Sequence, residues 1–349
     1  MAKEDAKLIH SFAVAPDGGK LSYYTMGAGP ALLVLHGAVT YALLHEELAV
    51  ALSPYYTVHL VSRRGRDTPN TAQGQPEATE TTPPPLNLSA PLRLGPTTYS
   101  RTYNPAFTSA VLATEVSDLA TLVAATHAEY ILAVSSGALI ALQMLLQTPR
   151  SPPLSSLRKV VLMEPPIFFT DHPTTCRLAD LPRFERELTA GDKAGAAVTA
   201  MRMIELGPAW IPRWIMRGLT GLMFRGQERE VAKHKALPGA EDRGVCTMAG
   251  LTDLLRYDFA VVEGMVGPAE RYGVLGGAGE DGEEGVVEIM LLSGEKSPAW
   301  IRQGTNVLSK TIAGVKTVVV EGVGHELLCN AEMRGLPAKA VPALCEFFQ

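Results

Sequence analysis

A buried strand passes directly into an apolar helix between residues 130 and 146. Residues 130–134 have the continuous apolar character of a strand buried on both faces, and residues 138–146 are apolar at helical spacing. Only Ser135-Ser136-Gly137 separates the two elements, so the chain must turn sharply there. A strand that leads into a helix without a longer loop is typical of the strand–helix–strand unit, whose strands pair in parallel. This junction therefore restricts the chain to an α/β fold.

The same alternation continues on both sides of the junction. Short apolar runs bounded by Gly, Pro or polar clusters predict further strands, and helical patterns separate most of them. The predicted strands are residues 21–25, 31–35, 57–61, 130–134, 159–163, 286–292 and 316–320. The predicted helices of this part are residues 41–52, a segment from 106 onward, 138–146, 300–309 and the C-terminal end. We expect a mostly parallel central sheet flanked by helices.

Two stretches interrupt the alternation. Residues 67–102 are rich in Pro, Thr, Gly and Asn without a sustained period, which predicts a long surface excursion. Residues 167–285 contain helical patterns but no clear strand, which predicts an inserted helical cap closed by the acidic loop 276–285. The predicted cap helices are residues 183–190, 196–206, 211–224 and 248–260. The cap then separates two parts of one core, residues 1–166 and 286–349.

Charge, cysteine usage and the N-terminal residues restrict the functional class. The formal net charge of −5 provides no basic field for nucleic acid. Cys176, Cys246, Cys329 and Cys345 have neither CxxC nor metal-ligand spacing, which favours reduced structural thiols. The N-terminal residues lack the apolar run of a secretory signal, and no segment approaches the ~20 apolar residues that span a bilayer. We expect a soluble, cytoplasmic protein that binds neither nucleic acid nor membrane.

Ser135 lies at the centre of the strand-to-helix turn. Ala133 and Gly137 stand two residues before and after it, which matches the nucleophile elbow G-x-S-x-G with alanine in the first glycine place. Small residues are needed there because the tight turn brings neighbouring backbone close. The alternative is a phosphate- or dinucleotide-binding turn, but neither GxGxxG nor a GK[ST] ending is present here. We interpret Ser135 as a nucleophile.

His325 is the histidine best placed to activate Ser135, because a serine without an adjacent base is a weak nucleophile. It follows the predicted strand 316–320 by a few residues, and Gly322 and Gly324 let the loop bend back over the sheet. No other histidine follows a late core strand. A structural role is the usual one for a lone histidine, but this position favours a catalytic base.

A second turn, His36-Gly37-Ala38, ends the predicted strand 31–35. The N–H of Ala38 can point at the oxyanion that forms beside Ser135, and the N–H of Ser136 supplies the second donor that acyl transfer requires. Taken alone, the turn is equally typical of a plain strand-to-loop connection. Together with the elbow, it predicts an oxyanion hole made by Gly37, Ala38 and Ser136.

These motifs resemble those of the α/β-hydrolase superfamily across nearly the whole chain. The matching features are the HG pair at 36–37, SRRGR at 62–66 where members carry D-x-R-G-x-G, the elbow, and the terminal G-x-G-H. The resemblance implies the α/β-hydrolase fold with an inserted cap and a triad aspartate after the strand 286–292. Ser297 stands at that place instead, and a neutral hydroxyl cannot stabilise the imidazolium that forms on His325.

Glu164 is the candidate replacement for the missing acid. It ends the strand 159–163, whose tip neighbours the nucleophile strand and opens on the same side of the sheet. Glu295 is the alternative, but it would have to reach His325 from a turn position two residues early. A Glu-Pro-Pro strand end also occurs in members with the usual aspartate, so a structural role for Glu164 stays open.

The set Ser135, Glu164 and His325 resembles the triad of the zearalenone lactonase family, fungal mycotoxin-degrading hydrolases with a Ser-Ser-Gly-Ala elbow and a glutamate after the sixth strand. Pro208-Ala209-Trp210 resembles the Pro-x-Trp whose indole contacts the lactone there. This chain is longer and begins its oxyanion turn with His36 rather than aspartate. The substrate-binding residues expected here are Trp210, His36 and Trp214. Trp210 and Trp214 would share one face of a cap helix, although packing against the core explains Trp214 equally well.

These features predict a serine hydrolase of carboxylic esters, with a hydrophobic, polyketide-like lactone as the favoured substrate. No metal or organic cofactor is implied, and the partner is the small substrate itself; a homodimer stays open. Epoxide hydrolase and dehalogenase chemistry is disfavoured because enzymes of those classes use an aspartate where this chain has Ser135. The alternatives are a non-hydrolytic lyase or cyclase on the same fold, and a binding protein that has lost turnover.

Overall fold

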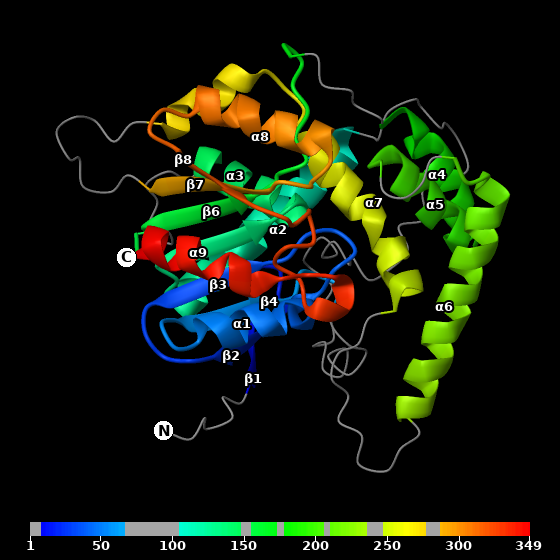
Figure 1. The fold of residues 1–349 in the computed structure, drawn as a ribbon, viewed down its shortest axis with the longest axis horizontal. Helices are drawn as coiled ribbons and strands as arrows, with labels where there is room; N and C mark the ends of the chain where they lie inside the picture. The colour runs from blue at the N-terminus through cyan, green and yellow to red at the C-terminus, as the bar shows by residue number, and fades with distance from the viewer. Residues whose placement is uncertain are drawn as a thin grey trace, which may run out of the picture.

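An eight-stranded, mostly parallel sheet forms the centre of the molecule (Figure 1). The computed structural model describes residues 8–66, 105–147, 155–172, 178–205, 210–235, 247–276 and 287–349. The strand order is β1-β2-β4-β3-β5-β6-β7-β8; β1 pairs antiparallel with β2, β2 antiparallel with β4, and the remaining neighbours pair in parallel. The strands are β1 (Ile9–Val14), β2 (Lys20–Met26), β3 (Ala31–Leu35), β4 (Thr57–Val61), β5 (Tyr130–Val134), β6 (Lys159–Met163), β7 (Glu288–Gly294) and β8 (Lys316–Val320).

The parallel strands bring five chain segments together at one edge of the sheet. In-register pairs such as Leu35 with Ala133 and Val134 with Met163 align the carboxyl ends of β3, β5 and β6. The residues that follow these strands, together with those after β7 and β8, therefore meet at the same edge. This is where ligands bind in open α/β sheets.

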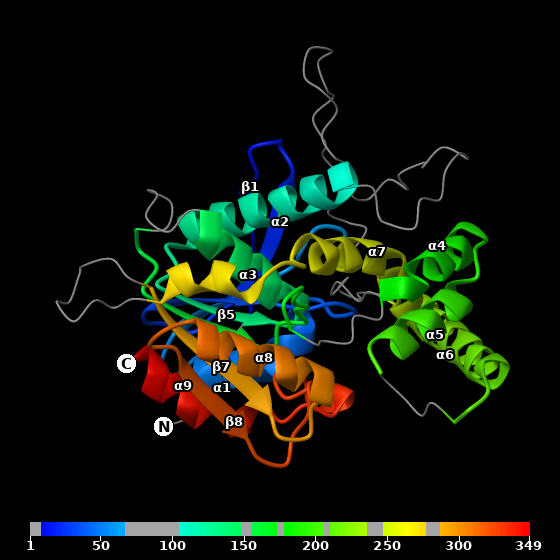
Figure 2. The ribbon, with the colours of Figure 1, turned by 90° about the horizontal axis from the view of Figure 1, so that it is seen from above.

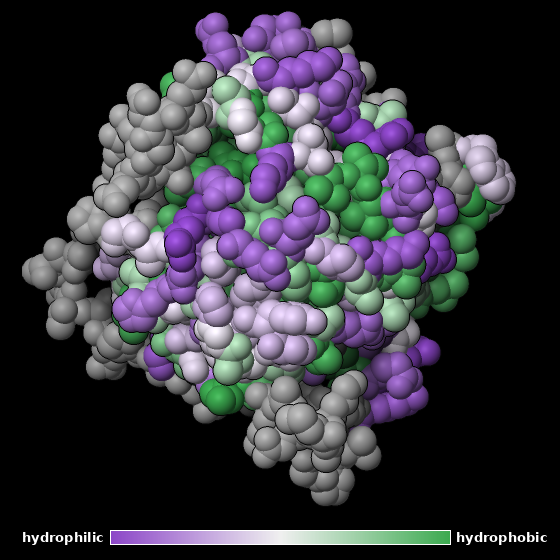
Figure 3. All heavy atoms as spheres, turned by 60° about the vertical axis from the view of Figure 1, so that its left-hand side comes forward, coloured by the Kyte–Doolittle hydropathy of each residue, from purple (hydrophilic) through white to green (hydrophobic). Residues whose placement is uncertain are grey.

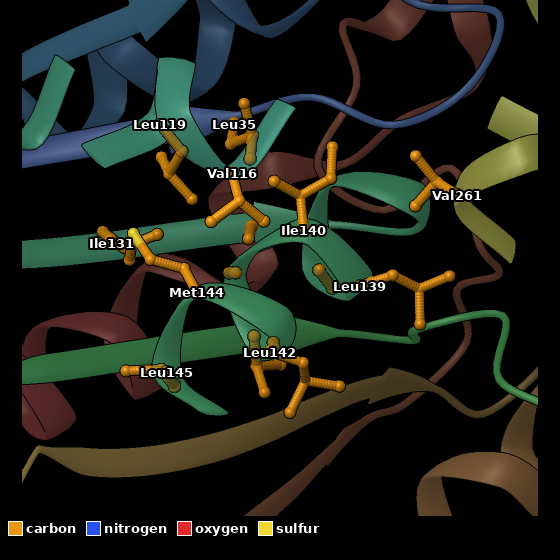
Figure 4. Packing of buried hydrophobic residues seen from close by; sticks show 14 of the residues in the cluster. Leu35, Val116, Leu119, Ile131, Leu139, Ile140, Leu142, Met144, Leu145 and Val261 are labelled. Atoms are coloured by element: carbon orange, nitrogen blue, oxygen red, sulfur yellow. The ribbon is translucent and has the colours of Figure 1, made fainter. Parts of the chain in front are cut away.

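Helices cover both faces of the sheet. One hydrophobic cluster joins the sheet to α2 (Pro105–Thr126), α3 (Ser136–Gln147) and α8 (Ala299–Thr311), and a second joins it to α1 (Glu46–Leu52) and α9 (Val341–Phe348). α3 is apolar almost all round and buried, as expected of a helix enclosed between other elements. Figure 4 shows Leu139, Ile140, Leu142 and Met144 of α3 packed among side chains of α2 and the sheet.

The chain between β6 and β7 forms the helical insertion. It contains α4 (Leu181–Thr189), α5 (Lys193–Met203), α6 (Arg213–Lys235), α7 (Met248–Gly264) and the 3-10 helix η5 (Ala269–Leu275). α4, α5 and α6 stand beside the sheet rather than over it (Figure 2). α7 belongs to both parts, because its Leu255 packs with α4 and α5 whereas its Ala260 and Val261 lie in the main core. A helix of the insertion is thus anchored in the core that carries the site.

The expectation that no segment is long and apolar enough to cross a membrane was wrong for α2. Residues 107–126 satisfy that criterion by length and composition, but 50% of that window is buried in the structure. Val111, Leu119 and Val123 of this helix lie in the main hydrophobic cluster. The apolar character of α2 is that of a core helix, which sequence hydropathy alone does not distinguish from a membrane span.

In the described part of the chain, hydrophobic side chains on one face of the surface are dispersed and the cysteines are free thiols. On the face seen in Figure 3, hydrophobic side chains form several separate patches between hydrophilic ones. Cys329 and Cys345 are free thiols, and burial raises the pKa of Cys329 to about 12, which makes it a weak nucleophile. Cys176, Cys246, the predicted excursion 67–102 and residues 277–285 of the acidic loop lie outside the described residues.

Candidate active site

Ser135 lies at the tip of β5, in the turn that leads into α3. Its backbone φ of +53° is left-handed, a conformation that costs a serine about 1–3 kcal/mol and is typical of functional sites. Two hydrogen bonds hold the turn: Ser135 N–H donates to Met163 O (2.8 Å) and Ala138 N–H donates to Ser135 O (2.8 Å). Ser135 is half-buried whereas Ser136 and Gly137 are buried. The turn thus leaves the serine as the accessible residue of the elbow.

Two glycines allow the turn after β3 to pack directly against the elbow. A Cβ on Gly137 would lie 2.6 Å from His36 O and 2.8 Å from Leu35 O. A Cβ on Gly37 would lie 2.7 Å from Ser135 Cβ and 3.5 Å from Ser135 Oγ. At either position these distances below 3 Å exclude a larger residue unless the backbone moves. Gly37, one of the residues predicted to form the oxyanion hole, is therefore next to the hydroxyl of Ser135.

Glu164 and His325 meet at the neighbouring strand ends. Glu164 directly follows β6 with a left-handed φ of +47°, and its side chain is fully buried. Its Oε2 lies 2.6 Å from His325 Nδ1, and its Oε1 accepts from Gly294 N–H (2.8 Å). The carboxylate is an acceptor, so Nδ1 carries the proton and Nε2 is the nitrogen left to act as a base. Among the described residues, no hydrogen bond joins His325 to Ser135 Oγ; such bonds are often long before substrate binds.

The two other positions considered for the acid do not contact His325. Glu295 Oε2 instead accepts from Gly322 N–H (2.8 Å). Ser297 is 3% exposed, and its Oγ has no hydrogen-bond partner within the described ranges. Glu164 is thus the carboxylate that the fold brings to Nδ1.

His36, predicted to bind substrate, is buried, which favours a structural role for its side chain. The side chain is fully buried, its Nε2 accepts from Arg63 N–H (3.1 Å), and its Nδ1 lies 2.8 Å from Gly37 O. Burial, with Arg66 and Arg63 nearby, holds the pKa of His36 well below its ordinary value. His36 is therefore neutral, and both ring nitrogens are used inside the protein.

The two tryptophans predicted to contact substrate point to solvent. Trp210 is 83% exposed and Trp214 is 75% exposed. They do not share a helix either, because Trp210 lies in the turn before α6, which begins at Arg213. Pro208 and Ala209, which carried part of the resemblance, lie outside the described residues.

Sequence reasoning missed a buried cluster of charged side chains beside Ser136. Arg63 Nη1 lies 2.6 Å from Asp258 Oδ1, and Arg63 Nη2 lies 2.7 Å from Glu115 Oε1. Arg66 Nη2 lies 2.6 Å from Asp258 Oδ2. Ser136 Oγ donates to Asp258 Oδ1 (2.9 Å) and accepts from Arg63 Nη1 (3.0 Å). None of these five residues is more than 3% exposed, so two guanidinium groups and two carboxylates form a charge-balanced cluster away from water.

Each charge in this cluster depends on its partners. Burial lowers the pKa of Arg63, but Glu115 and Asp258 outweigh that effect and hold the pKa above its ordinary value. Burial raises the pKa of Asp258, but Arg66 and Arg63 outweigh it and hold the pKa below its ordinary value. Arg63 and Asp258 are therefore ionised at neutral pH. Removing one member of a buried pair costs ~3–5 kcal/mol, because it leaves an uncompensated charge.

The signal for this cluster in the sequence was weak. Glu115 lies within an apolar helical run of α2 and Asp258 within one of α7, and such positions favour a paired charge. Their partner Arg63 comes from the segment after β4, which no local pattern connects to either helix. Within the described ranges no group of three His, Cys, Asp or Glu side chains could hold a metal ion.

The family comparison agrees with this architecture. The model of the alpha/beta hydrolase family matches residues 32–334, so the chain belongs to the α/β hydrolase family. A search of curated proteins gave no match.

Solved structures with the same fold cover nearly the whole chain. An alpha/beta hydrolase from Sphaerobacter thermophilus is similar with a TM-score of 0.59 and 22% identity, covering 97% of this chain and 100% of that chain. Naproxen esterase from Bacillus subtilis has a TM-score of 0.53 and 14% identity, covering 99% and 93%. The 2-hydroxy-6-oxo-6-phenylhexa-2,4-dienoate hydrolase of a Rhodococcus strain has a TM-score of 0.54 and 17% identity, covering 98% and 99%. At these identities the likeness establishes the fold alone.

Proposed function

We propose that this protein is a serine hydrolase of carboxylic esters, with a lactone of a hydrophobic molecule as its favoured substrate. The observation that carries the proposal is the contact of 2.6 Å between Glu164 Oε2 and His325 Nδ1, made one strand away from the elbow that exposes Ser135. A buried carboxylate on Nδ1 fixes the tautomer in which Nε2 can accept a proton. Family membership and the strained turn at Ser135 add support.

The reaction follows from the roles of these groups. His325 Nε2 takes the proton of Ser135 Oγ as the oxygen attacks the ester carbonyl carbon. The N–H groups of Ala38 and Ser136 stabilise the oxyanion, while Glu164 stabilises the imidazolium. His325 then gives the proton to the departing alkoxide. A water molecule, deprotonated by His325, then attacks the acyl carbon; the bond to Ser135 Oγ breaks, the acid leaves, and His325 returns the proton to Oγ.

A lactone as substrate gives a single product, because the alcohol and the acid remain in one molecule. Two features support this preference: the Ser135-Ser136-Gly137-Ala138 elbow and an acid taken from the end of β6, both of which resemble the zearalenone lactonase family. The exposed position of Trp210 removes one point of that resemblance. Several similar solved structures are described as esterases, which is in keeping with ester chemistry here.

A panel of substrates tests the proposal. The purified protein would be incubated with 4-nitrophenyl esters of increasing acyl length and with lactones of increasing ring size, and acid release would be followed at constant pH. We expect turnover that disappears in Ser135→Ala, with products that have gained one water. A product formed without added water would indicate a lyase or cyclase, and a folded protein inert to every ester would contradict hydrolysis. Turnover of linear esters but of no lactone would contradict only the lactone preference.

A further inference from the structure

The two oxyanion-hole donors proposed above stand on different segments of the chain. Ala38 follows β3, and Ser136 is the first residue of α3. Donors of this kind act only when each N–H lies about 2.7–3.1 Å from the oxyanion. The close contact of Gly37 with Ser135 brings the segments together, but it does not set the direction of either N–H.

On the β3 side, side chains fix the peptide that carries the Ala38 N–H. Gly37 O accepts from Thr40 Oγ1 (3.0 Å), and His36 Nδ1 lies 2.8 Å from the same oxygen. Gly37 C=O and Ala38 N–H belong to one planar trans peptide, so they point in opposite directions and fixing one fixes the other. His36 Nε2 accepts from Arg63 N–H (3.1 Å), which requires the proton to be on Nδ1 and makes Nδ1 the donor to Gly37 O.

On the α3 side, the hydroxyl of Ser136 is held from two directions. It accepts from Arg63 Nη1 (3.0 Å) and donates to Asp258 Oδ1 (2.9 Å), and Arg63 Nη1 and Asp258 Oδ1 lie 2.6 Å apart. These three groups form a closed triangle of charge-assisted hydrogen bonds, which are shorter and stronger than neutral ones. The triangle fixes the rotamer of Ser136 and restrains the backbone at the start of α3.

We propose that Arg63 is a positioning residue that fixes the direction of both oxyanion-hole N–H groups, those of Ala38 and Ser136. Its backbone N–H acts through His36 on the Ala38 N–H, and its guanidinium acts through Ser136 on the second donor. Asp258 completes the contact from α7, which ties the helical insertion to the geometry of the hole. The inference rests on the proposed ester hydrolysis, since a hole matters only if an oxyanion forms.

Arg63 itself is a poor test site, because its removal would leave the carboxylates of Glu115 and Asp258 without their partner. The test therefore removes the contact through Ser136 and the contact through His36 in separate variants. Ser136→Ala removes one hydroxyl and leaves the Arg63–Asp258 pair in place. His36→Asn keeps a donor near the place of Nδ1, whereas His36→Gln keeps an acceptor near the place of Nε2 but loses the donor to Gly37 O.

The matched control is Thr126→Val, which removes a buried hydroxyl that donates to Leu122 O (2.7 Å) in α2. For each folded variant, kcat and KM for an ester would be measured, together with the affinity for a trifluoromethyl ketone that forms a tetrahedral adduct with Ser135. We expect Ser136→Ala to lower kcat about 10- to 100-fold with KM nearly unchanged, and to weaken the ketone by a similar factor, because a misdirected donor loses much of its effect. His36→Asn removes the acceptor of Arg63 N–H and His36→Gln removes the donor to Gly37 O. Each should therefore lower kcat with KM nearly unchanged, whereas Thr126→Val should leave kcat unchanged.

The outcomes separate the two proposals. Unchanged kcat and ketone affinity in Ser136→Ala and His36→Asn, with an active wild-type protein, would overturn the role of Arg63 and leave ester hydrolysis standing. A wild-type protein that neither hydrolyses esters nor binds the ketone would overturn the proposed function first. If Ser136→Ala does not fold, His36→Asn decides, because it removes the acceptor of Arg63 N–H; unchanged kcat and ketone affinity in this variant contradict the proposal.

Discussion

Replacing Glu164 by glutamine exchanges one carboxylate oxygen for an NH₂ group, and the hydrogen bonds of Glu164 determine which oxygen is replaced. Gly294 N–H donates to Oε1 (2.8 Å), so the amide oxygen must keep that position and the NH₂ group must face Nδ1. Two donors cannot bond each other, so the imidazole must move its proton to Nε2, the nitrogen that should accept from Ser135. In serine proteases the equivalent wrong tautomer lowers kcat by about 10⁴, and we expect a loss of about 10³–10⁴, or about 4–5.5 kcal/mol in the barrier.

The assay compares kcat for a 4-nitrophenyl ester in Glu164→Gln, Glu295→Gln and the wild-type protein. Glu295→Gln is the matched control, because the Glu295 side chain is exposed and accepts from Gly322 N–H rather than contacting His325 Nδ1. Its kcat should stay within about twofold of wild type, since a surface change of this kind alters little. Circular dichroism would check that both variants are folded. Full activity in Glu164→Gln, with loss in Glu295→Gln, would refute the assignment of the acid.

Three further predictions concern the elbow, acid stability and the core. Gly37→Ala should lower kcat by at least about tenfold, because its Cβ would lie 2.7 Å from Ser135 Cβ and displace the oxyanion hole; unchanged kinetics would show that the two segments are not in contact. Burial lowers the pKa of His45 to about 4, below the unfolded value of 6.5, so only the unfolded state binds this proton between those pH values and stability falls as pH drops from about 6.5 to 4. Chemical denaturation should show a loss of about 3 kcal/mol from this group, absent in His45→Gln; parallel pH profiles would contradict it. Leu142→Ala, at a fully buried position of α3, should lower the unfolding free energy by about 2–5 kcal/mol, measured by urea titration, and a change below about 1 kcal/mol would be inconsistent with the packing in Figure 4.

The parallel strands β3, β4, β5 and β6 were predictable because they are buried on both faces, whereas β8 is an edge strand and mostly exposed. The predicted segments 31–35, 57–61, 130–134, 159–163 and 316–320 have the bounds of β3, β4, β5, β6 and β8. A continuous apolar run between turn residues is an unambiguous signal for such strands. β1 was missed because it is an antiparallel edge strand whose Ile9, Phe12 and Val14 remain exposed, so neither burial nor alternation marks it.

The backbone of the candidate site was easier to predict than its side chains. The turns at Gly37 and Ser135 are local, and sequence spacing alone indicates them. Whether His36 faces the substrate or the interior depends on Arg63, and that contact is set by tertiary packing. The cluster around Asp258 likewise joins α7, α2 and the segment after β4, which are far apart in the chain.

The most direct test of the account is covalent labelling of Ser135 by a fluorophosphonate. The reagent reacts with serines activated by an adjacent base and mimics the tetrahedral adduct of acyl transfer. We expect one label per molecule by intact mass, mapped to the peptide that contains Ser135 and absent in Ser135→Ala and in His325→Ala. A folded wild-type protein that remains unlabelled, or a label on another residue, would contradict the central claim that Ser135 is the nucleophile of this α/β hydrolase.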